Sequence, residues 1–143
     1  MKRIFNIFLL MIVGVFGIQA QQVNRLYLQD VNAIKGKTVS LPVFMENTSS
    51  KIVAMQFDVG VPYNVSINTG QGVMAESRYV DHVARVDYCP ESYSGYSNLQ
   101  FFRVMVFSPS NTPFKANDGQ VLTLEMPLSE SIEEEVDYQT SEK

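Results

Sequence analysis

Phe101-Phe-Arg-Val-Met-Val-Phe107 and, after a loop, Val121-Leu-Thr-Leu124 are the two runs that decide the fold. The first run is apolar at both parities, which is typical of a central strand that is buried on both faces. The second run alternates, so one face of its strand carries the apolar side chains Leu122, Leu124, Met126 and Leu128. Both runs therefore predict strands of a hydrophobic core.

The loop between these runs, residues 108–119, is rich in turn-forming residues. Pro109 and Pro113 fix φ and exclude a helix, and Asp118-Gly119 supplies a turn with positive φ. Phe114 is the one large apolar residue of the loop. We expect its side chain to be buried beneath the two prolines and to hold the loop against the core.

Alternating apolar residues predict further strands before Phe101. They span residues 25–31, 38–45, 53–61, 63–67 and 79–88. Pro42 removes a ladder donor, so the second of these strands should lie at a sheet edge or carry a bulge. In the third strand, Gln56 and Asp58 should face outward, opposite the apolar row.

No segment carries a sustained helical period with caps, although residues 74–78 suit a short helical turn. Residues 68–72 and 89–98 are rich in glycine and polar residues and are predicted as loops. About seven short strands separated by regular turns indicate an all-β fold, an antiparallel β-sandwich.

The N-terminus has the pattern of an export signal. Met1-Lys-Arg3 is basic, residues 4–17 are nearly all apolar, and Ile18-Gln-Ala20 suits cleavage. The apolar run is short for a bilayer span, which needs about 20 residues. We therefore expect a protein that is secreted or lies at the cell surface or in the periplasm. The predicted division of the chain is a signal peptide at 1–20, one β-sandwich domain at 21–129, and an acidic tail or the start of an incomplete last strand at 130–143.

Charge and cysteine content exclude several classes of partner. The net charge is −4, and removal of the predicted signal peptide, with Lys2 and Arg3, lowers it to −6. An acidic protein is unsuited to bind nucleic acid or an anionic membrane, so we expect neither partner, nor membrane insertion after cleavage. The single Cys89 cannot form an internal disulfide and is predicted to be a buried thiol.

The order of several motifs resembles a known family. Leu41-Pro-Val43 and Met55-Gln-Phe-Asp-Val59 lie on consecutive predicted strands, and the loop at 108–119 leads into the strand at 121–124. Over residues 26–128 this order resembles cohesin-like domains, above all modules of exported proteins from Bacteroides-type gut bacteria. The resemblance implies a jelly-roll sandwich, shared with cohesins and certain cellulose-binding modules. It also implies a non-catalytic module that binds a polysaccharide or a protein partner at the cell surface.

Two groups of residues are candidates for binding. Gln56 and Asp58 lie on the strand that, in cohesins, belongs to the partner-binding sheet; the alternative is an ordinary solvated face. Tyr88, Tyr93 and Tyr96 flank or occupy a polar loop, where exposed aromatic rings can stack on sugars. The absence of tryptophan weakens the sugar interpretation. The alternative is that these tyrosines cover one end of the sandwich.

The chain contains few residues that could act in catalysis. His82 is the only histidine, so a histidine triad or relay has no second member. We also expect no structural or catalytic zinc site, because the chain has only one histidine and one cysteine to serve as ligands. A carboxylate pair for glycoside hydrolysis would have to come from Asp58, Glu76, Asp81 or Asp87, and nothing places two of these across a cleft. We therefore expect no enzyme activity.

Calcium is the one metal that the sequence leaves open. Glu46, Asn117 and Asp118 offer oxygen ligands at loop ends, and relatives of the resembled fold sometimes bind calcium. No EF-hand pattern is present, and Asp118 followed by glycine is typical of a plain turn. We therefore expect no cofactor.

The resemblance implies one more strand after the acidic turn, paired near the N-terminal strand. Val136-Asp-Tyr138 suits the start of such a strand, but the residues up to Lys143 are too polar to continue an apolar row. We therefore expect a disordered tail and a mature protein that is either marginally stable on its own or self-associates through an open sheet edge. The competing interpretation of the whole chain is a structural spacer or assembly domain without a ligand of its own.

Overall fold

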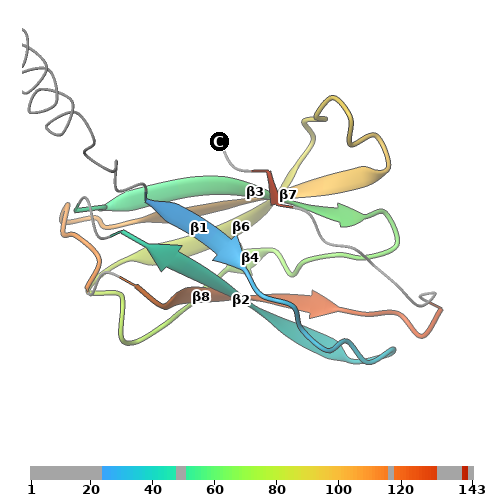
Figure 1. Ribbon diagram of the computed structural model, residues 1–143, viewed down its shortest axis with the longest axis horizontal. Coiled ribbons are helices and arrows are strands. Elements are labelled where there is room, and N and C mark those ends of the chain that lie inside the picture. The colour runs from blue at the N-terminus through green and yellow to red at the C-terminus, as the bar shows by residue number, and fades with distance from the viewer. Residues whose placement is uncertain (1–23, 48–50, 116–117, 132–139, 142–143) are drawn as a thin grey trace, which may run out of the picture.

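Two antiparallel sheets pack face to face (Figure 1). The computed structural model describes residues 24–47, 51–115, 118–131 and 140–141, so the predicted signal peptide lies outside it. The strands are β1 (Arg25–Leu28), β2 (Thr38–Glu46), β3 (Ala54–Pro62), β4 (Gly70–Gln71), β5 (Val73–Met74), β6 (Val83–Cys89), β7 (Leu99–Phe107), β8 (Gln120–Pro127) and β9 (Thr140–Ser141). The first sheet has the order β1-β2-β8-β5, and the second has the order β4-β6-β7-β3-β9. The predicted all-β antiparallel sandwich is confirmed, and within the described ranges no helix is long and apolar enough to cross a membrane.

The first sheet builds its half of the core from two alternating rows. On β2 the buried row is Val39, Leu41, Val43 and Met45. On β8 it is Leu122, Leu124 and Met126, and the buried Leu128 follows directly after the strand. The two strands pair with Leu41 opposite Leu124 and Val39 opposite Met126, so that both rows face the second sheet. Both predicted rows are confirmed.

Pro42 sits beside a bulge and away from a sheet edge. β2 lies between β1 and β8, so the edge alternative is wrong. The ladder with β1 ends where Leu28 pairs with Val43, and Pro42 therefore lies beyond it. The register with β8 shifts between Val43 and Phe44. The predicted bulge is confirmed, and Pro42 costs no bond to β1 because β1 has ended.

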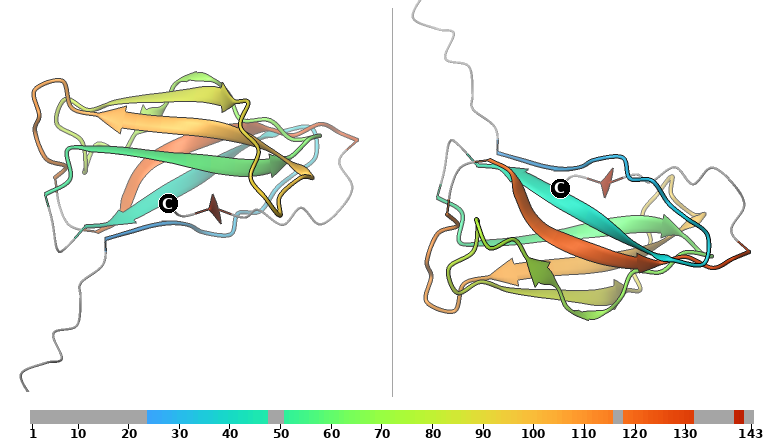
Figure 2. Two further views of the ribbon diagram at one scale, coloured as in Figure 1. Left: turned by 90° about the horizontal axis from the view of Figure 1, so that it is seen from above. Right: turned by 90° about the horizontal axis from the view of Figure 1, so that it is seen from below.

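In the second sheet, β7 runs centrally between β6 and β3 (Figure 2). Its inner row, Phe102, Val104 and Val106, is buried. On the opposite side Phe101 is buried, Arg103 is half-buried and Phe107 is 47% exposed. Burial on both faces was the wrong prediction for most of this strand, because only one end of its outer side is covered by the loop at 90–98.

Residues 63–72 differ from the prediction in both of their parts. The predicted strand at 63–67 is absent; Val65 and Ile67 reach the core from an irregular segment. The predicted loop at 68–72 contains β4, and β5 follows it on the other sheet, so this segment closes one side of the sandwich. Gly72 passes so near β6 that a Cβ on it would lie 2.9 Å from the Cβ of Ala84.

Phe114 is buried and holds its loop against the core as predicted, but its ring packs on His82, whereas the prediction named Pro109 and Pro113. Its side chain is 6% exposed. Its ring stacks on the ring of His82 with centroids 3.9 Å apart, and its backbone N–H donates to the carbonyl of Ile52 at 2.9 Å. The predicted helical turn at 74–78 is a single turn, closed by a bond from the N–H of Arg78 to the carbonyl of Ala75.

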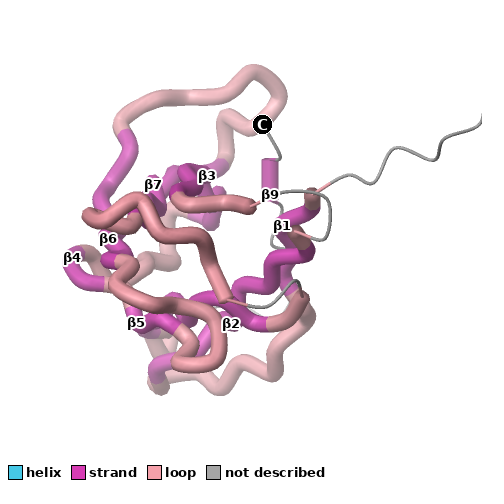
Figure 3. Tube along the Cα trace, turned by 90° about the vertical axis from the view of Figure 1, so that its left-hand side faces the viewer, coloured by secondary structure: helices cyan, strands magenta, loops and turns pink. Residues whose placement is uncertain are grey.

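Part of the predicted acidic tail returns to the second sheet. Thr140 and Ser141 form β9, which pairs antiparallel with Val59 and Asp58 of β3. Figures 2 and 3 place β9 between β3 and β1, along the side of the sandwich opposite β4 and β5. The predicted disorder is therefore wrong for these two residues; the stretches at 132–139 and 142–143 lie outside the described ranges.

Candidate functional site

The outward side of β3, β7 and β6 gathers the β3 residues that were predicted to bind. Partners in antiparallel strands point to the same side of a sheet, so each cross-strand set forms a row. The rows on this side are Ala54, Phe107 and Val83; Gln56, Met105 and Arg85; Asp58, Arg103 and Asp87; Gly60, Phe101 and Cys89. We call this set of residues the outer face.

One end of the outer face is apolar and open to water. Phe107 is 47% exposed and its neighbour Val83 is 40% exposed. Ala54 completes the row and is exposed, and the half-buried Met105 lies in the next row beside the exposed Gln56. Contiguous exposed apolar side chains on adjacent strands mark interaction surfaces more often than single ones do. Gln56 thus has the apolar neighbours that a recognition surface needs.

Asp58 forms the charged centre of the outer face. Its side chain was predicted to face water, yet it is only 7% exposed. Arg103 explains the burial, since its Nε donates to Oδ1 of Asp58 at 2.8 Å and its Nη2 donates to Oδ2 at 2.9 Å. Nη2 also reaches Oε2 of Glu91 at 3.1 Å. These bonds, first to Asp58 and then to Glu91, raise the pKa of Arg103 and lock a two-pronged ion pair in place.

Tyr93 ties the loop at 90–98 to this ion pair. Its hydroxyl donates to Oδ2 of Asp58, and this bond raises the pKa of Tyr93. Its ring meets the ring of Phe101 edge-on, with centroids 4.6 Å apart. Gly60 leaves room for that packing, because a Cβ there would lie 2.8 Å from Cε1 of Phe101. The loop therefore covers the second end of the outer face.

The predicted tyrosines do not share one surface. Tyr93 and Tyr96 are half-buried in the loop, where the N–H of Tyr96 donates to the carbonyl of Tyr93 at 3.1 Å. Tyr88 is 56% exposed, but it belongs to the inward parity of β6 and meets Phe102 edge-on at 5.9 Å. The arrangement brings Tyr93 to Asp58 and leaves Tyr88 apart from both.

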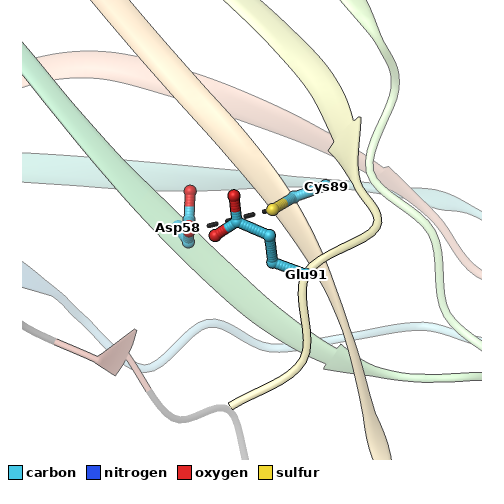
Figure 4. Close-up of side chains that lie close together, drawn as sticks. All are labelled: Asp58, Cys89 and Glu91. Carbon is cyan, nitrogen blue, oxygen red and sulfur yellow. Dashed lines mark hydrogen bonds between the residues drawn. The ribbon is translucent and has the colours of Figure 1, made fainter.

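Asp58, Cys89 and Glu91 bring possible metal ligands together (Figure 4). One ligand atom from each lies within 4.8 Å of the others, and Cys89 is buried as predicted. The donor set does not fit a metal ion, however, because the guanidinium of Arg103 already binds both oxygens of Asp58 as well as Glu91. A fixed positive charge at this place repels a second cation. The cluster is an internal ion-pair network.

The predicted calcium donors are engaged elsewhere or lie outside the described ranges. Oε2 of Glu46 pairs with Nη2 of Arg25 at 3.0 Å. Oδ1 of Asp118 accepts from the N–H of Gly119 at 2.7 Å, which is the bond of a plain turn. Asn117 is not among the described residues.

His82 is a core residue in this structure. It is 5% exposed, and its Nδ1 accepts from the N–H of Val80 at 3.3 Å. Burial lowers the pKa of His82, and the neighbouring Asp81 opposes this in part. A buried neutral imidazole stacked on Phe114 is poorly placed to exchange protons with a substrate.

Sequence reasoning missed Arg78, which is only 1% exposed. Its Nη1 donates to the carbonyls of Met45 and Gly119, each at 2.9 Å. Its Nε donates to the carbonyl of Lys115 at 2.8 Å, and its Nη2 donates to Oδ1 of Asn47 at 2.6 Å. Burial lowers the pKa of Arg78, and Asp118 opposes this. Arg78 therefore joins the end of β2 to the loop before β8; its polar neighbours in the sequence gave no sign of burial.

Comparison with known proteins adds no assignment: no protein family, no curated protein and no solved structure matches this chain.

Proposed function

We propose that the protein is an exported, non-catalytic binding module whose outer face recognises a protein partner. The observation that carries the proposal is the exposed apolar row of Ala54, Phe107 and Val83 on three adjacent strands. The next row contributes the polar side chains Gln56 and Arg85 on one side of it, and polar side chains also form the rim of protein interfaces. The resemblance to cohesin-like, jelly-roll domains supports it, because the matching strand in cohesins belongs to the partner-binding sheet.

A protein partner suits this surface better than a polysaccharide. Sugar rings stack on flat exposed aromatic faces. Tyr93 presents its hydroxyl to Asp58 and its ring to Phe101, and Tyr88 lies apart from it. Phe107 and Val83 instead offer compact apolar contacts of the kind that fill the centre of a protein interface.

A binding role without catalysis is consistent with the polar groups near the face. Asp58 is neutralised by Arg103, and the lone histidine, His82, is buried against Phe114. Neither group is available as a base or nucleophile. The alternative function, a structural spacer, is favoured only if no partner exists for the exposed row.

The test compares capture by the wild-type protein with capture by a Phe107→Glu variant. Immobilised protein is incubated with envelope and secreted fractions of the source organism, and retained proteins are identified by mass spectrometry. Tyr63→Glu is the matched control, because Tyr63 is 66% exposed but lies outside the outer face. The same samples are applied to a glycan array.

The proposal predicts a protein that is retained by the wild type and by Tyr63→Glu but lost with Phe107→Glu. Retention that is equal for all three would show that the outer face is not the binding surface. Binding to glycans alone would replace the protein partner by a polysaccharide. If neither the capture experiment nor the glycan array detects a ligand, the result would favour the structural spacer.

A further inference from the structure

One of the two ring nitrogens of His82 is buried without a hydrogen-bond partner. The side chain is 5% exposed, and Nδ1 accepts from the N–H of Val80 at 3.3 Å, so the neutral ring carries its proton on Nε2. Nε2 has no partner among the described residues. Buried polar atoms are nearly always satisfied, so this exception needs a reason beyond folding.

A short segment closes over this ring. We call residues 109–114 the flap. The residues on either side of the flap are fixed to the sandwich, since the N–H of Ser108 donates to the carbonyl of Val53 at 3.1 Å and the N–H of Lys115 donates to the carbonyl of Arg78 at 2.8 Å. These fixed ends let the flap open as one unit while the rest of the fold stays in place.

His82 is central to the closure of the flap. The ring of Phe114 stacks on the imidazole, with centroids 3.9 Å apart and the planes at 20°. The N–H of Phe114 donates to the carbonyl of Ile52 at 2.9 Å. Nearer the start of the flap, the N–H of Ser110 donates to Oδ2 of Asp81 at 3.2 Å, but Ser110 is exposed, so water can replace that bond. The buried part of the closure is therefore the stack of Phe114 on His82.

A second proton on the ring conflicts with the closed flap. It would go to Nδ1, where the N–H of Val80 already points, so that two donors would face each other. The imidazolium would also be a buried charge beneath Phe114. Burial accordingly lowers the pKa of His82, and Asp81 and the backbone of Thr112 oppose this in part.

The charged groups around the ring do not remove this conflict. The charged group that acts on His82 is Asp81, and its carboxylate already accepts bonds from the flap. The flap itself carries no ionisable side chain. Lys51 precedes the segment that bonds to the flap and Lys115 follows the flap, and both side chains are exposed. Hydration after the flap opens is therefore the main way to stabilise the imidazolium.

We propose that His82 is a pH switch that holds the flap closed while its ring is neutral and releases the flap when the ring takes up a proton. The switch lies at the apolar end of the outer face. His82 precedes Val83, the flap begins two residues after Phe107, and Val83 and Phe107 are cross-strand partners in the exposed row. An open flap adds Phe114 to the exposed apolar surface at this end. The release itself needs no partner, so it stands or falls separately from the proposed function.

The direction of the switch follows from proton linkage. An exposed histidine titrates near about pH 6.5, whereas the buried ring of His82 takes up its proton only at lower pH. Above about pH 6.5 the ring is neutral in both forms and the flap stays closed. Below this pH the open form gains about ten-fold per pH unit until the closed form is protonated as well. Opening should therefore rise by up to about 30-fold between about pH 7.5 and about pH 5.

The test is hydrogen exchange of the untagged protein, followed by NMR. The amide of Phe114 reports on the flap, and the amide of Val104, at the centre of β7, reports on unfolding of the whole sandwich. After correction for the intrinsic effect of pH, protection of Phe114 should fall by about ten-fold or more between about pH 7.5 and about pH 5. At both pH values Phe114 should exchange at least about ten-fold faster than Val104, because it needs only local opening. The amide of Tyr96, bonded within the loop at 90–98, should show no change with pH.

Two variants assign the effect to the histidine. His82→Gln should abolish the pH dependence at Phe114, whereas Asp81→Asn, which keeps the histidine, should retain it. If His82→Gln does not fold, the wild type decides. Its single histidine gives unambiguous imidazole signals, and the loss of protection at Phe114 should level off at the pH where these signals titrate.

Three results would overturn the proposal. The first is protection of Phe114 that stays constant while the imidazole titrates. The second is equal protection of Phe114 and Val104 at both pH values, which would mean that acid unfolds the whole sandwich. The third is a pH dependence that survives in His82→Gln and disappears in Asp81→Asn, which would make Asp81 the switch.

Discussion

Arg78→Met removes the guanidinium while keeping much of the length of the side chain. The substitution takes donors from the carbonyls of Met45 and Lys115 and from Oδ1 of Asn47. The carbonyl of Gly119 also accepts from the N–H of Met45, so it retains a partner. Three acceptors would therefore lose a bond in a buried site, at roughly 1–3 kcal/mol each.

Relief from burying a charge offsets part of this cost. We therefore expect Arg78→Met to lower the free energy of unfolding by about 3 kcal/mol, and the melting temperature by roughly 10 °C for a domain of this size. Arg78→Lys should recover only part of the loss, because an ammonium group lacks the planar fork that reaches several carbonyls at once. Urea unfolding followed by circular dichroism measures both variants.

Arg85→Met is the matched control. The side chain of Arg85 is 63% exposed and forms a surface ion pair with Asp87, two residues away, so its loss should cost less than about 0.5 kcal/mol. A cost for Arg78→Met within about 0.5 kcal/mol of this control would refute the idea that Arg78 holds the end of β2 against the loop before β8.

Phe114→Ala should cost about 3–5 kcal/mol in urea unfolding, the usual range for a buried aromatic, and a loss below about 0.5 kcal/mol would mark a surface residue. Asp58→Asn should cost about 2–4 kcal/mol because it breaks a largely buried ion pair, whereas Asp87→Asn in the same row should be nearly neutral. The lowered pKa of His82 means that the unfolded chain takes up this proton first, so the contribution of His82 to stability should be constant above about pH 6.5 and fall as the pH drops below it. His82→Gln should flatten that part of the curve, and an unchanged slope would show that another group is responsible.

The sequence predicts the long strands well, because a strand is recognised from two features alone: the two-residue period of its apolar side chains and the side of the sheet that is buried. The rows that begin at Val39 and Leu122 satisfy both. The same rule fails for residues 63–67, where Val65 and Ile67 alternate but reach the core without a partner strand. Two-residue strands such as β4 carry no period at all, so no pattern could have predicted them.

The candidate site was less predictable, because burial of polar residues depends on partners far away in the sequence. Gln56 and Asp58 were placed on the outer face from the period of β3. That Asp58 is buried follows from Arg103, which is 45 residues away and has no local signature. Arg78 poses the same problem, since its acceptors come from two other segments. The alternating pattern predicts on which side of the sheet a residue lies, but it does not predict which residues that side chain contacts.

The outer face as a recognition surface is tested most directly by the affinity of a captured partner protein for the wild type and for Phe107→Glu, measured by biolayer interferometry. Loss of a central apolar contact and burial of a new charge should weaken the complex by at least about 30-fold, while Tyr63→Glu should change the affinity by less than about two-fold. Equal affinity of the wild type and Phe107→Glu would contradict the account.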